Sequence, residues 1–108
     1  MLDTRTRNIV KYYIPETDTL NSISDLFSAF SDQTRLKILS ALSISEMCVG
    51  DLADVISVNQ TTVSHQLRFL RTHNLVQAKR HGKIIFYSIA GEKVSEILAV
   101  GLSQLGYD

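Results

Sequence analysis

The sequence has little of what stabilises small secreted domains or crosses membranes. It contains one cysteine, Cys48, one proline, Pro15, and no tryptophan in 108 residues. A single cysteine excludes a disulfide within the chain and a zinc site made of cysteines alone, and it is typical of a reducing compartment. No apolar run approaches the roughly 18 residues of a membrane span, and the start, MLDTRTRNIV, lacks the basic-then-apolar order of a signal peptide. We therefore expect a cytoplasmic protein without a membrane partner.

The chain is also short, which predicts a single domain with one modest core. Its 108 residues are 44% hydrophobic and 20% charged, as in an ordinary soluble domain. A domain of this size buries only about two-thirds of the surface of its unfolded chain. An apolar helix face left outside the core would therefore favour pairing with a second subunit.

Acidic residues are missing from one long segment. The net charge is zero, from 11 basic and 11 acidic residues, but no acidic residue lies between Asp54 and Glu92. That segment holds the following cations and histidines: His65, Arg68, Arg71, His73, Lys79, Arg80, His81 and Lys83. This asymmetry indicates DNA or another anionic partner on one face, the alternative being a chance gap in a short chain.

The first half of the chain reads as an arm followed by short helices. Residues 1–16 mix cations with Tyr12 and Tyr13 and stop near Pro15, which predicts an N-terminal arm, helical in part, whose tyrosines cover apolar surface of a dimer. Residues 17–108 are the domain itself. Apolar residues three and four apart predict a helix from about residue 18 to residue 30. Asp32 suits the N-cap of a second helix.

A third and a fourth helix follow. Residues 51–56 predict a brief helix that packs Leu52, Val55 and Ile56, preceded by a short extended piece around Cys48. Asn59 can cap a longer helix that ends near residue 73. Its apolar residues at positions 63, 67 and 70 form one stripe, and the opposite face carries hydrogen-bonding groups and cations only.

The chain then changes to a period of two and back to a helical period. Residues 75–79 and 83–89 predict two antiparallel strands, with Arg80, His81 and Gly82 at the tip of the hairpin. Residues 91–105 repeat the helical period without a break. Two short helices joined by a tight turn and followed by a basic hairpin predict a mainly α fold with a small β-hairpin wing, the winged helix-turn-helix.

This arrangement suits duplex DNA. A helix fits the major groove, where donors and acceptors near its N-terminus meet base edges, and hairpin cations neutralise phosphates or enter the neighbouring minor groove. The candidate DNA-binding residues are Gln60, Thr61, Thr62, Ser64, His65, Arg68, Arg71, Lys79, Arg80 and Lys83. The plainer alternative is a solvated face on an ordinary bundle helix.

Four segments carry a more specific resemblance: FSAFSDQTRLKILSAL, EMCVGDLADVI, NQTTVSHQLRFLRTHNLV and KRHGKIIFYSI. Together they resemble the ArsR/SmtB family of bacterial winged-helix repressors over roughly residues 20–105. The resemblance implies a homodimer that binds a palindromic DNA operator and leaves it when an inducer, often a metal ion, is bound. It also implies a dimer interface built from the first and last helices, here Leu20, Ile23, Phe27, Val94, Ile97, Leu98, Leu102 and Leu105.

The sequence departs from the family pattern at the familiar metal positions. Some members carry a second cysteine where this chain has Gly50, and one thiolate cannot form a tetrahedral site for a soft metal. Other members use Asp and His on the last helix, where this chain offers Glu92 and Glu96 without a histidine. We therefore predict no resident cofactor, and a metal ion as inducer stays open as an alternative.

Cys48 is the one candidate for a sensing residue. A lone cysteine at an apolar strand edge is most often a small buried hydrophobic side chain. The first alternative function is nevertheless a redox- or metal-responsive repressor that switches through Cys48, and the second is a winged-helix module for protein association. An enzyme is excluded because Ser64 and His65, neighbours on one helix, point about 100 degrees apart and no acid or glycine-rich phosphate loop accompanies them.

Overall fold

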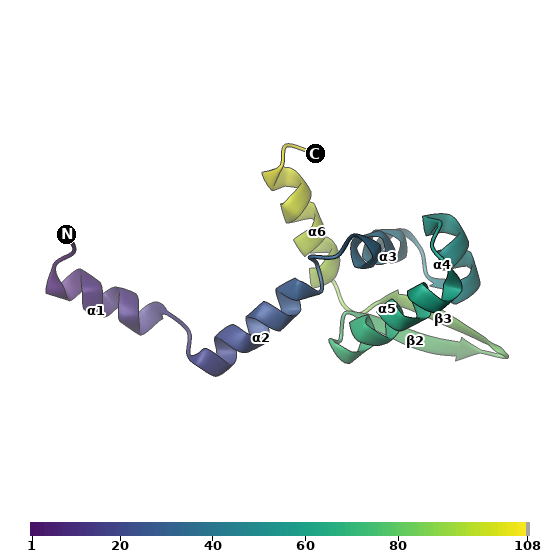
Figure 1. Ribbon diagram of the computed structural model, residues 1–108, viewed down its shortest axis with the longest axis horizontal. Helices are drawn as coiled ribbons and strands as arrows, with labels where there is room; N and C mark the ends of the chain where they lie inside the picture. Colours follow the sequence, from purple (N-terminus) through teal and green to yellow (C-terminus); the bar gives the residue numbers. More distant parts are fainter. Residues whose placement is uncertain (108) are drawn as a thin grey trace.

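The computed structural model describes residues 1–107, which form six helices and one three-stranded antiparallel sheet (Figure 1). The elements are α1 (Thr4–Tyr13), α2 (Thr17–Ser28), α3 (Gln33–Ile44), β1 (Met47–Cys48), α4 (Val49–Ile56), α5 (Gln60–Thr72), β2 (Val76–His81), β3 (Ile84–Ile89) and α6 (Lys93–Gln104). The strand order is β1-β3-β2, so the predicted hairpin gains a short third strand at the edge of β3. The mainly α fold with a β-hairpin wing is confirmed.

Side-chain caps begin the helices where the sequence predicts them. The Asp32 carboxylate accepts a hydrogen bond from the backbone N–H of Arg35 at 3.0 Å, and Asn59 accepts one from Thr62 at 2.8 Å. Both caps satisfy a backbone donor that has no partner inside its helix. The predicted arm is more regular than expected, because Asp3 caps α1 in the same way and most of residues 1–16 are helical.

One hydrophobic core holds α3, α4, α5, the sheet and the start of α6 together. Its buried residues are Ala29, Ile38, Leu39, Leu42, Leu52, Ala53, Ile56, Val63, Leu67, Leu70, Leu75, Val76 and Val94. The prediction that Val55 packs inward is wrong: its side chain is 63% exposed, and Ala53 takes the inner position beside Leu52 and Ile56. Periodicity alone did not distinguish these two neighbouring positions.

The tip of the wing also differs from the prediction. Arg80 and His81 belong to β2, where they pair with Ile85 and Ile84, so the turn consists of Gly82 and Lys83. Gly82 has a φ of 64°, a backbone conformation that glycine adopts without a Cβ clash and that a tight hairpin turn requires at its first central position. The first strand of the wing therefore reaches two residues closer to the tip than the alternation of the sequence suggested.

The first two helices extend away from the rest of the chain. Figure 1 shows α1 and α2 reaching out to one side, while α3, α4, α5 and the sheet cluster on the other and α6 rises between them. The radius of gyration is 17.9 Å, against about 13 Å for a compact chain of 100 residues. Among residues 1–107, no helix is both long enough and apolar enough to cross a bilayer.

Candidate nucleic-acid interface

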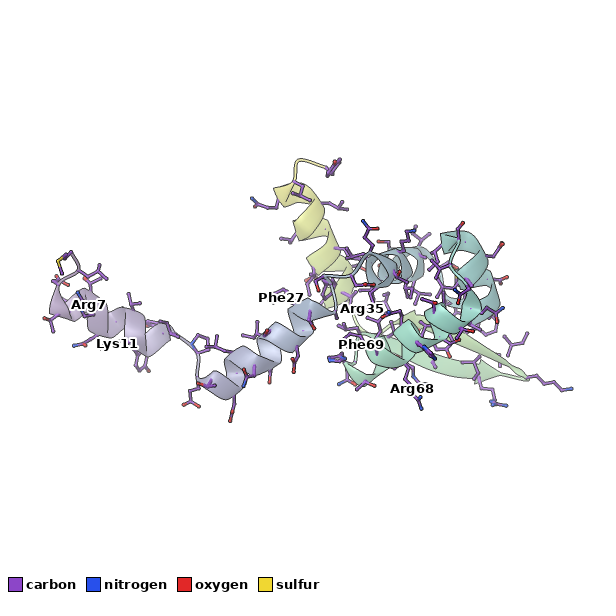
Figure 2. All side chains as sticks on the ribbon, in the orientation of Figure 1. Arg7, Lys11, Phe27, Arg35, Arg68 and Phe69 are labelled. Atoms are coloured by element: carbon purple, nitrogen blue, oxygen red, sulfur yellow. The ribbon has the colours of Figure 1, made fainter. Side chains whose placement is uncertain are left out.

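Helix α5 presents a polar surface to solvent while its other side anchors the core. Val63, Leu67 and Leu70 are buried, which fixes the rotation of the helix about its own axis. The opposite residues are all exposed: Gln60, Thr61, Ser64, His65, Arg68 and Arg71. In Figure 2 the side chain of Arg68 points away from the body of the protein. Thr62, also predicted to contact DNA, is only half-exposed, since it lies between the two faces.

The turn between α4 and α5 sets the angle of this surface. Ser57 ends α4 in the left-handed region with a φ of 58°, and its N–H donates to the Asp54 carbonyl at 3.2 Å. The next residue, Val58, donates to the Ala53 carbonyl at 3.1 Å. These hydrogen bonds satisfy two carbonyl groups at the C-terminal end of α4, and the chain turns sharply into α5. The short α4, the tight turn and the longer α5 form a helix-turn-helix.

Gly50 and Gln60 approach each other across this motif. A Cβ added at Gly50 would lie 3.3 Å from Nε2 of Gln60, which is closer than most Cβ contacts. The side chain of Gln60 therefore rests against the first turn of α4. From the sequence, Gly50 is only the place of a missing cysteine, and its contact with the DNA-facing helix is seen only in the fold.

The cations of the wing point in different directions. Lys79 and Arg80 are adjacent on β2, opposite Phe86 and Ile85 on β3, so their side chains leave opposite faces of the ribbon. Lys83 lies in the turn, and all three are exposed. The wing thus spreads its positive charge around its edge and tip instead of collecting it on one face.

The residues around Cys48 do not assemble a metal site. Cys48 is half-buried on β1 opposite Phe86. His73 lies at the end of α5, with its Nδ1 2.9 Å from the Phe69 carbonyl oxygen, and Glu96 pairs with Lys93 at 3.4 Å. Across residues 1–107, no three His, Cys, Asp or Glu side chains come close enough together to hold a metal ion.

The predicted dimer residues divide into three groups by their exposure in the single chain. Leu20, Ile23 and Phe27 of α2, and Leu102 and Leu105 of α6, are large apolar side chains exposed to solvent. Ile97 and Leu98 are half-buried beside them. Val94 was placed wrongly, because it is only 2% exposed and packs in the core of the single chain.

Arg35 is a further functional candidate that the sequence does not predict. It lies at the first turn of α3, and Figure 2 shows its side chain together with Phe69 of α5. The guanidinium carbon lies 4.4 Å from the centre of the Phe69 ring, and Nη1 donates to Gln66 at 3.1 Å. In the sequence, the only hint of this role is that Arg35 is a cation next to the apolar residues of α3.

The chain is similar to known bacterial regulatory proteins. Residues 32–78, which hold α3, α4 and α5, match the family described as "Bacterial regulatory protein, arsR family". A fragment of Mb0332 from Mycobacterium bovis, a homodimeric winged helix-turn-helix DNA-binding domain, is 31% identical with a TM-score of 0.76, and the match covers 82% of each chain. This chain belongs to the ArsR family.

Further relatives fit this membership. The transcriptional repressor SmtB homolog of Synechocystis is 41% identical over 74% of this chain, and the cadmium resistance regulatory protein CadC homolog of Staphylococcus aureus is 36% identical over 70% of it. These matches span 61% and 64% of the relatives' own lengths. The crystal structure of NolR from Sinorhizobium fredii, 28% identical with a TM-score of 0.79, covers 100% of this chain and 98% of its own. The ArsR family consists of regulatory proteins and not of enzymes.

Proposed function

We propose that this ArsR-family chain is a sequence-specific DNA-binding repressor that acts as a homodimer in the cytoplasm. The observation that carries the proposal is the exposed face of α5, which offers hydrogen-bonding groups and cations and belongs to a segment without any acidic residue. The SmtB homolog, which is named a transcriptional repressor, and the DNA-binding domain of Mb0332 support the same function. A protein-association module is disfavoured, because the cores of protein interfaces are depleted in such charge.

The proposed mode of binding uses each surface for a different part of the duplex. The first turns of α5 enter the major groove, where Gln60, Ser64 and His65 reach base edges. Arg68, one turn later, is long enough for a guanine edge or a phosphate. The wing follows the backbone, where Lys79, Arg80 and Lys83 neutralise phosphates and set the register of the protein on DNA.

The proposed dimer brings two such surfaces together. The exposed apolar side chains of α2 and α6 become buried when they pack against the same surface of a second copy, related by a two-fold axis. Two-fold symmetry of the protein then requires two inverted half-sites in the operator.

Selection from a pool of random duplexes by the purified protein tests the proposal. We expect enrichment of an inverted repeat. On that duplex, Gln60→Ala or His65→Ala lowers specific affinity by about 1–3 kcal/mol and random-sequence affinity much less. Arg80→Ala or Lys83→Ala lowers both affinities and reduces the salt slope by about 1. Lys93→Ala removes an exposed cation from α6 and serves as the control. Failure to enrich any sequence would refute the proposal.

A metal ion stays the alternative inducer to be tested, because one relative is named for cadmium resistance. In residues 1–107 a single chain gathers fewer than three ligands, so a metal site would need ligands from both protomers. Titration of the protein–DNA complex with zinc and cadmium, repeated on Cys48→Ser, separates the possibilities. Release that disappears in Cys48→Ser would assign the switch to this thiol; release that survives would place the site elsewhere. We expect neither metal to change DNA affinity by the roughly 5–150-fold of a typical allosteric coupling.

A further inference from the structure

One guanidinium joins three helices of this protein. Arg35 lies on α3, yet every polar contact of its side chain is to α2, its C-cap residue or α5. Nε and Nη2 point toward the end of α2, and Nη1 points toward α5. Figure 2 shows Arg35 and Phe69 close to the C-terminal end of α2.

On one side, Arg35 closes the C-terminus of α2. Nη2 donates to the Ser28 carbonyl at 2.8 Å and Nε donates to the Ala29 carbonyl at 3.1 Å. Helix α2 has no basic residue in its own last turn, so Arg35 supplies the positive charge that the negative end of a helix favours. The neighbouring Ala29 is fully buried, which anchors this junction in the core.

On the other side, Arg35 holds the inner face of α5. Nη1 donates to Oε1 of Gln66 at 3.1 Å, across 31 residues of sequence. The flat guanidinium also lies 4.4 Å from the centre of the Phe69 ring, within the range of a cation–π interaction. Phe69 in turn stacks on His73, with ring centres 4.2 Å apart.

These contacts connect the proposed dimer helix directly to the proposed DNA-reading helix. Helix α2 has no fully buried residue in the part of the chain that the structure describes, although Leu26 packs against the core near its C-terminal end, so packing alone constrains the direction of α2 weakly. We propose that Arg35 is a positioning residue that holds α2 at a fixed angle to α5 and thereby sets the distance between the two α5 helices of the dimer. This inference rests on the proposed homodimeric function.

Lysine cannot replace arginine in this role. The guanidinium offers several donors in one rigid plane, which lets it bond two carbonyls and a side-chain amide while its face covers an aromatic ring. An ammonium keeps the charge but is a compact point with a flexible stem. Arg35→Lys therefore removes the geometry and retains the electrostatics.

The first test measures the distance between the α5 helices without DNA. A spin label is attached through Thr72→Cys at the exposed end of α5, in a Cys48→Ser background, so that the dimer carries one label on each protomer. We expect a narrow distance distribution in this parent and a broad or shifted one after Arg35→Lys. Arg7→Lys makes the same chemical change on α1 and should leave the distribution unchanged.

The second test measures how strictly the protein reads half-site spacing. The selected inverted repeat is lengthened or shortened by about one to three base pairs around its optimum. We expect Arg35→Lys to weaken binding at the optimal spacing by about tenfold, the equivalent of one lost charge-assisted hydrogen bond. At the other spacings the loss should be smaller, so the discrimination between spacings falls. Phe69→Leu and Gln66→Leu, which remove only the α5 side of the link, should reduce discrimination in the same direction and serve if Arg35→Lys fails to fold.

The outcomes separate this inference from the function on which it rests. A dimer whose label distribution stays narrow in Arg35→Lys, or a variant that loses the same factor at every spacing, would overturn the positioning role alone. A parent protein that gives no distance between labels, or no preference for an inverted repeat, would contradict the proposed homodimeric function and the inference with it.

Discussion

Helices α1 and α2 are about as amphipathic as α4 and α5 of the body, which runs from α3 to α6, but they bury their apolar faces differently. In the body, α3, α4 and α5 each contribute three residues to the core. Within residues 1–107, neither α1 nor α2 has a buried residue, although both carry several large apolar side chains. An amphipathic pattern therefore indicates that one helix face is apolar, but it does not indicate whether that face packs in the core of its own chain or against a second subunit.

The two regions should respond differently to the same substitution. Leu39 of α3 is fully buried, whereas Leu20 of α2 is 43% exposed in the single chain. We expect Leu39→Ala to lower the free energy of unfolding by about 2–5 kcal/mol, because it leaves a cavity in the core. Leu20→Ala should instead raise the dissociation constant of the dimer. Denaturant unfolding at several protein concentrations separates the two effects, and an equal loss in both variants would show that α2 belongs to the core.

A charge placed on α2 should break the dimer and leave the body folded. Phe27 is 54% exposed, and Phe27→Glu would place a carboxylate in the proposed dimer interface. We expect the dimer to weaken by at least about 100-fold, a cost of the size usual for a buried unpaired charge. Sedimentation at micromolar concentration measures the fraction of dimer in each variant. Ile44→Glu is the matched control, since Ile44 is 88% exposed at the end of α3; equal dissociation in both variants would contradict the proposed interface.

Features that depend on near neighbours in the chain were predictable from the sequence. Asp32 and Asn59 cap their helices because each accepts a hydrogen bond from a residue only three positions later. The helical stripe of α5 was predicted correctly as well, since only one of its faces is apolar. The fold class followed from these local patterns in their order along the chain, whereas the family came from the resemblance of four segments.

Features that depend on distant neighbours were not predictable in the same way. Val94 was assigned to the dimer interface with the rest of its stripe, but the first turn of α6 packs in the core of its own chain. Arg35 acquires its role only when the chain brings Gln66 and Phe69 beside it. Gly50 and Gln60 meet because the turn between α4 and α5 folds the two helices together. The periodicity of the sequence does not predict such contacts between distant residues.

Removing α1 should have a smaller effect than charging α2. Deletion of residues 1–14 takes away exposed Ile9, Val10, Tyr12 and Tyr13, none of which contributes to the core of the body. We expect unchanged denaturant unfolding of the body and a dimer weakened by about tenfold, roughly the value of burying one large apolar side chain. Sedimentation equilibrium gives the dissociation constant. A truncated protein that no longer folds would show that α1 supports the body itself.

The smallest expected effect concerns the first turn of α1. The side chain and the backbone N–H of Thr6 donate to the Asp3 carboxylate, the latter at 2.7 Å, and these hydrogen bonds hold the pKa of Asp3 below its ordinary value. Because the folded helix favours the ionised form, the cap is present at neutral pH and is lost as the pH falls through the lowered pKa. The Thr6 amide proton should therefore shift in an NMR titration in acid, while the amides of α5 stay in place. Asp3→Asn keeps a cap that does not ionise and should abolish the titration, whereas Asp3→Ala should fray the first turn at every pH. A Thr6 amide that still titrates in Asp3→Asn would assign the proton to another group.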